Sequence, residues 1–242
     1  MISYGKNGPY YRIDGIAPLV AGTAAKTVNR IDYSAGPSDV RRAEKALLKS
    51  IVGIEERNIL MLNQMHEDLI VALDRYPDSD RLIYADADGM ITALPGLCLV
   101  IRTADCVPVC AFDVRQRVLG VVHSGWRGCR LAIAGKLIGK MKSLFGSRES
   151  DMEVFLLPSI GPHSYTVGAE VASLFPDDIT CRGGRIYLDL WKNISGALEA
   201  AGVPGEKIHV TGLCTMRLKD EFFSHRNADV GRNLNFACIS GG

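Results

Sequence analysis

The fold is decided by residues 96–128, which read GLCLVIRTADCVPVCAFDVRQRVLGVVHSGWRG. Three runs in this stretch, 96–101, 107–112 and 118–122, are almost wholly apolar and show no polar alternation. Strands with this pattern are buried on both faces of a sheet. The third run leads through a glycine-bearing turn into a single helix that is predicted to end at Gly146. The sequence therefore predicts a mixed α/β or α+β fold, with layered sheets flanked by helices.

Further elements are predicted on both sides of this stretch. Apolar runs at 59–62, 154–157, 186–188 and 208–213 indicate additional strands. Ser38 is expected to cap a helix that ends at Gly53, and Asp189 is expected to cap a second helix that ends at Gly202. The glycine pair in Arg182-Gly183-Gly184-Arg185 is typical of a hairpin turn.

Composition excludes several classes of protein. The 242 residues are 47% hydrophobic and 23% charged, which favours one elaborate globular domain spanning 1–242. A formal net charge of +1 provides no general attraction to nucleic acid or to a membrane surface. No apolar stretch approaches the roughly 18 residues needed to span a bilayer. The 7 cysteines are odd in number and mostly lie in apolar runs, as in a reduced, cytoplasmic protein.

Three segments place polar side chains directly beside predicted strands. They are Asn63-Gln64-Met65-His66, Thr103-Ala104-Asp105-Cys106 and His123-Ser124-Gly125-Trp126-Arg127-Gly128. Strand ends are where ligand sites form in α/β proteins. The thiolate of Cys106 and the imidazoles of His66 and His123 suit zinc, and they leave a fourth position for a water whose pKa falls to about 7. The spacing alone is also compatible with a buried cysteine and two hydrogen-bonded histidines.

The same residues fit a second kind of site, which needs no metal. In that site His123 deprotonates Cys106, and the sulfur attacks a carbonyl or amidine carbon. Asp105 could then orient an imidazole through its second nitrogen, although an aspartate at a strand end is often a turn residue. The residues by themselves leave both alternatives open.

Candidate anion ligands occur in two places. Arg127 lies in the turn 125–128, where backbone N–H groups and a guanidinium suit a phosphate. Arg226 and Arg232 add two guanidiniums close to the aromatic pair 222–223. The aromatic rings could stack on a base, or they could be core residues beside solvated arginines.

Taken together, four ordered motifs resemble those of the YfiH-type laccase-domain family. They are Asp86-Ala87-Asp88-Gly89, Thr103-Ala104-Asp105-Cys106-Val107-Pro108-Val109, His123-Ser124-Gly125-Trp126-Arg127-Gly128, and Phe222-Phe223-Ser224-His225-Arg226 with Gly231-Arg232. The resemblance begins near Leu62 and extends to the C-terminus. Members of this family, long labelled multicopper polyphenol oxidases, are described as zinc-dependent enzymes that phosphorolyse purine nucleosides and deaminate adenosine.

The resemblance implies roles for particular residues. His66, Cys106 and His123 become the metal ligands, with zinc as the expected ion and copper as the alternative. They also become catalytic, together with Asp105 as a candidate proton shuttle. Gln64, Arg127, Arg226 and Arg232 become the candidate ligands for substrate and phosphate. The implied fold has layered mixed sheets flanked by helices.

The implied activity is that of a purine nucleoside phosphorylase, a glycosyl transferase, with adenosine deaminase activity as a hydrolase. The expected substrates are adenosine, inosine, guanosine and S-methyl-5′-thioadenosine, with phosphate as cosubstrate and a monomer as one compatible state. Three alternatives remain: a copper-dependent polyphenol oxidase, a metal-free Cys-His hydrolase, and a nucleoside-binding protein without turnover. The copper oxidase is disfavoured because efficient four-electron oxygen reduction needs more imidazoles than 5 histidines comfortably supply.

Several positions depart from the family pattern. Lys26 stands in place of an arginine, and a lysine is not a bidentate phosphate ligand. Leu157-Pro158 replaces a Gly-Pro pair. Ser164 and Thr166 stand where the family has a cysteine and a glutamate, and Asn227 replaces a second arginine. These changes make phosphorolysis a weaker expectation than metal binding.

Overall fold

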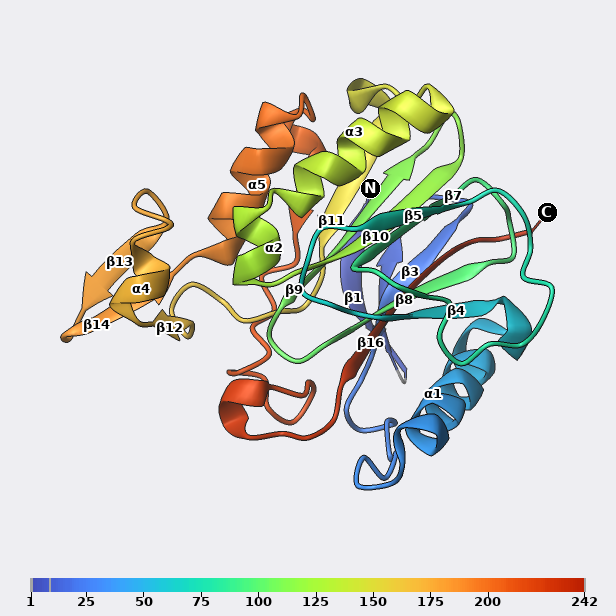
Figure 1. Ribbon diagram of the computed structural model, residues 1–242, viewed down its shortest axis with the longest axis horizontal. Helices are drawn as coiled ribbons and strands as arrows, with labels where there is room; N and C mark the ends of the chain where they lie inside the picture. The colour runs from blue at the N-terminus through green and yellow to red at the C-terminus, as the bar shows by residue number, and fades with distance from the viewer. Residues whose placement is uncertain (1, 9, 242) are drawn as a thin grey trace.

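The computed structural model describes residues 2–8 and 10–241 and contains two large sheets and one small sheet (Figure 1). The first sheet has 7 strands, in the order β1 (Ser3–Asn7), β2 (Tyr10–Asp14), β3 (Leu19–Ala24), β16 (Asn233–Ile239), β8 (Cys98–Thr103), β4 (Ile59–Asn63) and β6 (Ala85–Asp86). The second has 6, in the order β15 (Ile208–Val210), β11 (Met152–Leu156), β9 (Val107–Asp113), β10 (Val118–Ser124), β7 (Gly89–Thr92) and β5 (Ile70–Leu73). The small sheet has 3, in the order β12 (Thr166–Val167), β14 (Arg185–Leu188) and β13 (Ile179–Arg182).

The helices cover the outer faces of the two large sheets, except for the short helix Ala169–Ala172, which packs against β14 of the small sheet (Figure 1). They are α1 (Pro37–Val52), α2 (Trp126–Arg130), α3 (Ile133–Phe145), α4 (Ala169–Ala172) and α5 (Leu190–Ala200), with single 3₁₀ turns at Glu56–Asn58, Glu149–Asp151, Gly205–Lys207 and His225–Asn227. Figure 1 shows α1 on one side of the sheets and α3 with α5 on the other. Within the described part of the chain, none of the helices has the length and apolar character that crossing a bilayer requires.

Three apolar clusters hold these layers together. Leu99 of the first sheet and Phe112 and Leu119 of the second share one cluster, so the two sheets pack face to face. Leu48 of α1 packs against the first sheet in another cluster. Leu137 of α3 belongs to the third, on the outer face of the second sheet. The order of layers is therefore helix, sheet, sheet, helix, which confirms the predicted class.

The strands that decide the fold lie where the sequence predicts them. The runs at 96–101, 107–112 and 118–122 form β8, β9 and β10, and all seven residues of both β9 and β10 are buried. The glycine pair 183–184 forms the turn between β13 and β14, with φ values of +56° and +70° that favour glycine. No predicted run corresponds to β1, β2, β3, β5, β6, β7, β12 or β16.

Two helix predictions require correction. Helix α1 begins at Pro37 and is capped by Gly36 without a side-chain hydrogen bond, so Ser38 is not its cap. Proline suits the first helical position because its φ is already helical and it lacks the N–H that would remain unpaired there. The predicted single helix before Gly146 is two helices, because Ala132 has a φ of +53° and breaks the hydrogen-bond ladder between α2 and α3.

The predicted caps Asp189, Gly53 and Gly146 are confirmed, whereas α5 ends at Ala200 with Ala201 as its C-cap, before the predicted end at Gly202. Asp189 accepts a hydrogen bond from the backbone N–H of Lys192 at 2.9 Å, at the start of α5. Gly53 and Gly146 end α1 and α3 with φ values of +70° and +68°. These left-handed residues stop a helix without the steric cost that a Cβ would bring.

Candidate active site

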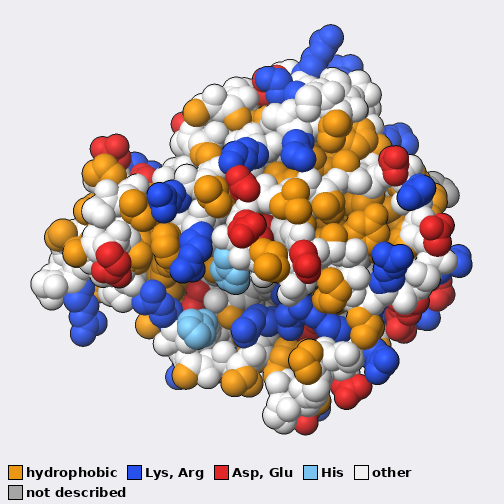
Figure 2. Space-filling view, in the orientation of Figure 1, with side chains coloured by type: hydrophobic (Ala, Val, Ile, Leu, Met, Phe, Trp, Pro, Cys, Tyr) orange, Lys and Arg blue, Asp and Glu red, His pale blue; other side chains and the backbone are white. Residues whose placement is uncertain are grey.

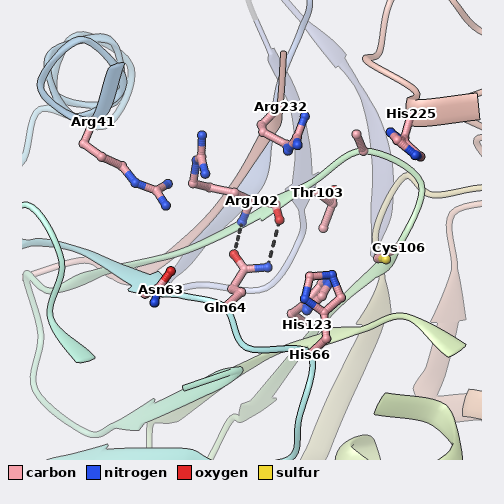
Figure 3. A pocket seen from close by; sticks show the side chains of 11 residues that line it. Arg41, Asn63, Gln64, His66, Arg102, Thr103, Cys106, His123, His225 and Arg232 are labelled. Atoms are coloured by element: carbon pink, nitrogen blue, oxygen red, sulfur yellow. Dashed lines mark hydrogen bonds between the residues drawn. The ribbon is translucent and has the colours of Figure 1, made fainter. Parts of the chain in front are cut away.

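The strand register brings the three predicted metal ligands together. β4 and β8 are parallel, so both end at the same edge of the first sheet. β10 pairs with β9 so that Ser124 lies opposite Val107, which sets His123 of β10 beside Cys106. The ligand atoms of His66, Cys106 and His123 all lie within 4.8 Å of one another, and Figure 3 shows the two imidazoles side by side with the thiol close to them.

One buried carboxylate holds both histidines. Asp88 precedes β7, is fully buried, and lies 2.8 Å from Nδ1 of His123 through Oδ1. It also accepts backbone N–H groups of Met65, His66 and Glu67 at 2.9–3.0 Å, so the loop after β4 wraps around it. These contacts stabilise His66 at a φ of +62°, which is uncommon for a residue with a Cβ. Because Asp88 engages Nδ1 of His123, Nε2 is the nitrogen that remains for a ligand.

The electrostatics of the site favour a cation. Burial opposes a charge on His123, but the negative charge of Cys106 and the hydrogen bond to Asp88 outweigh it and raise the pKa of His123 to about 9. Burial and the neighbouring charge of His123 lower the pKa of His66. A positive charge is thus stabilised between Cys106 and Asp88. A cation held by the thiolate of Cys106 and two neutral imidazoles would lie at this position.

The three candidate ligands lie where two cavities meet. The first cavity has a volume of about 390 Å³ and is lined by Arg41, Asn63, Gln64, His66, Arg102, Thr103, Ala104, Cys106, His123, His225 and Arg232. The second has about 360 Å³ and is lined by His66, Ala104, Asp105, Cys106, His123, Gly125, Trp126, Arg127, Gly128, Tyr165, His225 and Arg226. We call them the arginine lobe and the aromatic lobe. His225 borders both, and Figure 2 shows histidine side chains beside a cluster of Lys and Arg on this face.

The aromatic lobe pairs each of its two arginines with a ring. The guanidinium of Arg127 lies 4.4 Å from the ring centre of Trp126, and that of Arg226 lies 4.8 Å from the ring centre of Tyr165. Arg226 also donates from Nη1 to the backbone oxygen of Thr166 at 2.8 Å. The lobe therefore offers flat, partly cationic surfaces next to the candidate metal ligands.

The predicted phosphate ligands are divided between the lobes. Arg127 and Arg226 line the aromatic lobe, whereas Arg232 lines the arginine lobe. Gln64 also lines the arginine lobe, but its amide pairs with the backbone of Arg102, accepting its N–H at 2.8 Å and donating to its oxygen at 2.9 Å (Figure 3). The side chain of Gln64 thus forms hydrogen bonds to the backbone of β8 just beyond the end of β4.

Asp105 borders the aromatic lobe with both carboxylate oxygens occupied. Oδ1 accepts the hydroxyl of Thr215 at 2.7 Å, and Oδ2 accepts the backbone N–H of Arg226 at 2.8 Å. Asp105 itself has a φ of +94°. These contacts favour a role in holding the loop around 226 against the site over a role in transferring protons.

Lys26 points away from both lobes. Its ammonium donates to Asp229 at 2.7 Å and to the backbone oxygen of Lys219 at 3.1 Å, and it lies over the ring of Phe223. Asn227 donates to the backbone oxygen of Met216 at 2.9 Å. Both residues contact the loop 216–229, and neither of them lines either lobe.

Sequence reasoning missed several residues of the site. Asp88 was quoted within a motif but given no role, and Arg41 and Arg102 were not considered. His225 and Trp126 occur in the sequence motifs without an assigned role, and Tyr165 is not among the predicted site residues. The motif 86–89 could have identified Asp88, because an aspartate at the start of an apolar strand becomes buried and then needs a hydrogen-bond donor. No feature of the neighbouring sequence distinguishes Arg41 as a site residue, because it lies in the helix that is predicted to end at Gly53.

Comparisons with known proteins identify the family of this chain and agree with its fold. The family model described as multi-copper polyphenol oxidoreductase laccase matches residues 22–240. A purine nucleoside phosphorylase of Bacteroides thetaiotaomicron is 30% identical over 223 residues, covering 86% of this chain and 83% of that protein. Adenosine deaminase RL5, from an unknown prokaryotic organism, is 28% identical over 227 residues, covering 88% and 86%. The crystal structure of YlmD from Geobacillus stearothermophilus has a TM-score of 0.88 at 25% identity, and both chains are fully covered.

The predicted resemblance and the layered fold are both confirmed by these similarities. A match over residues 22–240 includes His66, Cys106, His123, Asp88 and both lobes. By sequence and by fold, the chain belongs to the YfiH-type family of multi-copper polyphenol oxidoreductase laccases.

Proposed function

We propose that this protein is a zinc-dependent purine nucleoside phosphorylase that acts on adenosine, inosine, guanosine and S-methyl-5′-thioadenosine. The observation that carries the proposal is the position of His66, Cys106 and His123 between an aromatic lobe and an arginine lobe. A nucleoside and a phosphate need two such neighbouring surfaces. Relatives named as purine nucleoside phosphorylases support the same substrate class.

The donor set fits a zinc ion. The ligand atoms of a thiol and two imidazoles lie within 4.8 Å of one another. Asp88 contacts the ring of His123 and accepts a hydrogen bond from the backbone N–H of His66. When bound, the metal would supply Lewis-acid polarisation of the reacting group at the junction of the lobes. The protein's part is to hold the ligands in place, and the buried Asp88 achieves this without contacting the substrate.

The residues of the lobes position the reactants. Trp126 and Tyr165 provide ring faces for the purine, and His225, which borders both lobes, lies where it can contact the ribose. An oxygen of phosphate then forms the bond to C1′ of the ribose while the bond from C1′ to N9 breaks. The bonding electrons leave with the purine, which takes up the proton that hydrogen phosphate loses. Holding both reactants in line accounts for much of the rate enhancement.

Adenosine deamination is a second activity that the same ligand set supports. Nucleobase deaminases combine cysteine and histidine zinc ligands with a site that binds the purine edge. One relative is named as an adenosine deaminase. We expect inosine and ammonia as products of this reaction.

The metal-free alternative has one specific observation in its favour. Cys106, His123 and Asp88 follow one another in the order thiol, imidazole and carboxylate, as in a cysteine hydrolase. His66 has no role in that arrangement, although the loop that carries it is held by three hydrogen bonds to Asp88. We therefore favour the metal site.

The decisive experiment measures products and metal together. Protein of known metal content is incubated with each nucleoside, with and without phosphate, and the products are identified by chromatography. We expect free base and ribose-1-phosphate, or its methylthio analogue, only when phosphate is present. Product formation that is unaffected by phosphate would contradict phosphorolysis. Activity that resists a chelator but is lost on thiol alkylation, tested with Cys181→Ser to exclude the exposed Cys181, would favour the hydrolase.

A further inference from the structure

The arginine lobe contains a cationic cluster in which Arg232 joins two arginines, Arg41 and Arg102, that have no assigned role. Arg41 comes from α1, Arg102 from β8, and Arg232 from the segment just before β16, so the three are brought together only by the fold. Figure 3 shows them above Gln64 on the side of the lobe away from Cys106. Such convergence of guanidiniums in one cavity is typical of an anion site.

The three guanidiniums are held in place by the protein. Glu44, which is fully buried, accepts Arg102 Nε at 2.9 Å and Arg102 Nη2 at 2.8 Å, and its other oxygen lies 3.4 Å from Arg41 Nη1. Arg232 Nη1 donates to the backbone oxygens of Val230 and Gly231 at 2.9 and 2.8 Å. Each guanidinium has five N–H donors, so donors remain for a ligand. Ligand binding would therefore require little ordering of these side chains.

The cluster contains more positive than negative charge. Arg41 and Arg102 share the single carboxylate of Glu44, and Arg232 contacts only backbone oxygens. Three positive charges and one negative charge leave two positive charges without a partner among these four groups. Burial and the charge of Arg102 lower the pKa of Arg41, as expected where cations are crowded. The side chains of Arg41 and Arg102 are only 15% and 17% exposed, so water screens this charge poorly. An anion with two negative charges would compensate it.

We propose that the arginine lobe binds a phosphoryl dianion, with Arg41, Arg102 and Arg232 as its ligands, and that this anion is the inorganic phosphate consumed in the reaction. The identification of the anion as cosubstrate rests on the proposed function. The purine then occupies the aromatic lobe, where Arg127 and Arg226 stack on rings. This arrangement places the two reactants on opposite sides of His66, Cys106 and His123, and the ribose lies between them.

Direct binding of inorganic phosphate tests this assignment without turnover. Calorimetry on the metal-loaded protein compares the wild type with Arg41→Ala and Arg232→Ala. The matched control is Arg42→Ala, on the same helix, whose side chain is 67% exposed and pairs with Asp39. Loss of one charged hydrogen-bond partner is expected to weaken phosphate binding by about 10- to 100-fold. Arg42→Ala should bind like the wild type, and thermal unfolding checks that each variant is folded.

Kinetics separate the two lobes. Arg41→Ala should raise the KM for phosphate and leave that for the nucleoside nearly unchanged, whereas Arg127→Ala should do the reverse. If Arg41→Ala and Arg232→Ala bind phosphate like Arg42→Ala, the assignment of the lobe is wrong even when phosphorolysis occurs. If phosphate binding depends on Arg41 but no nucleoside is phosphorolysed, the anion site stands and the proposed function fails. If a nucleoside 5′-monophosphate binds through Arg41 and inorganic phosphate does not, the phosphoryl group belongs to the substrate and the cosubstrate assignment is overturned.

Discussion

At the scale of single residues, Asp88 organises the site from outside the set of metal ligands. Its buried carboxylate lies 2.8 Å from Nδ1 of His123 and accepts three backbone N–H groups of the loop that carries His66. Burial alone would raise the pKa of Asp88, but the hydrogen bonds from His123 and this loop lower it, so the carboxylate stays ionised. A buried carboxylate in this position makes the imidazole a stronger metal ligand.

Asp88→Asn should therefore weaken metal binding. An amide keeps the shape of the carboxylate but loses its charge and one acceptor oxygen, so we expect metal affinity to fall by about 10- to 100-fold. Competition with a chromogenic chelator measures the change. Asp86→Asn is the matched control, because Asp86 is exposed and bonds only to Asn63 among the contacts described. Equal affinities for the two variants would contradict the role of Asp88.

Gly125 gives a second prediction at this scale. A Cβ on Gly125 would lie 2.7 Å from Sγ of Cys106, closer than real contacts allow, so the thiol must shift. We expect Gly125→Ala to lower the metal content of the purified protein, measured by elemental analysis, while the protein remains folded. Gly139→Ala is the control, because a Cβ there meets nothing within 4 Å. Full metal content in Gly125→Ala would show that the thiol has more freedom than this packing implies.

At the scale of elements, helix α3 lies on β10 through a glycine. Gly120 faces Leu137, and an added Cβ would lie 2.6 Å from its Cδ1 and 3.3 Å from the sulfur of Met141. Both side chains are fully buried, so neither has open space to move into. The close approach of α3 supports the same strand that carries His123.

Gly120→Ala should destabilise the protein through overpacking. We expect a loss of about 1–3 kcal/mol in the free energy of unfolding, measured with denaturant. Adding Leu137→Ala should create space for the new methyl group, so the double variant should lose less than the sum of the two single changes. Strict additivity would show that the two side chains do not compete for the same space.

At the scale of the whole molecule, the candidate metal site joins the two large sheets. His66 follows β4 of the first sheet, His123 lies in β10 of the second, and Cys106 lies in the connection from β8 to β9. A metal bound only in the folded state stabilises that state by about 2.7 kcal/mol at a free concentration of 100 times its Kd. The junction between the sheets should therefore depend on metal for part of its stability.

Removal of the metal should lower Tm. For a chain of this size the stabilisation corresponds to a shift of roughly 5–10 °C, measured by calorimetry with and without a chelator. Cys106→Ala should unfold at the same temperature in both conditions, because it has lost a ligand. Cys181→Ala, which changes an exposed cysteine, should keep the difference. A chelator effect that persists in Cys106→Ala would place the metal elsewhere.

Features that depend on near neighbours in the chain can be predicted from the amino-acid sequence. Buried strands were readable because β8, β9 and β10 are apolar on both faces, and helix ends were readable at Gly53 and Gly146 because a left-handed φ favours glycine. The three candidate metal ligands were found because cysteine and histidine beside apolar strands are few. Their roles in binding and catalysis stay predictions that the experiments above can test.

Which residues far apart in the sequence come into contact is visible only in the tertiary structure. Strand β16 is not apparent in the sequence because asparagines interrupt its apolar run. In the fold, the side chain of Asn235 accepts a hydrogen bond from the hydroxyl of Thr23 at 2.8 Å and donates one to the backbone oxygen of Ile101 at 3.0 Å, on the two neighbouring strands. The division of the arginines into two lobes and the pairing of Asp88 with His123 depend in the same way on strand order and register. Hydrogen bonds between strands form from backbone groups that every residue carries, so the local sequence shows that a strand exists and does not show its partner.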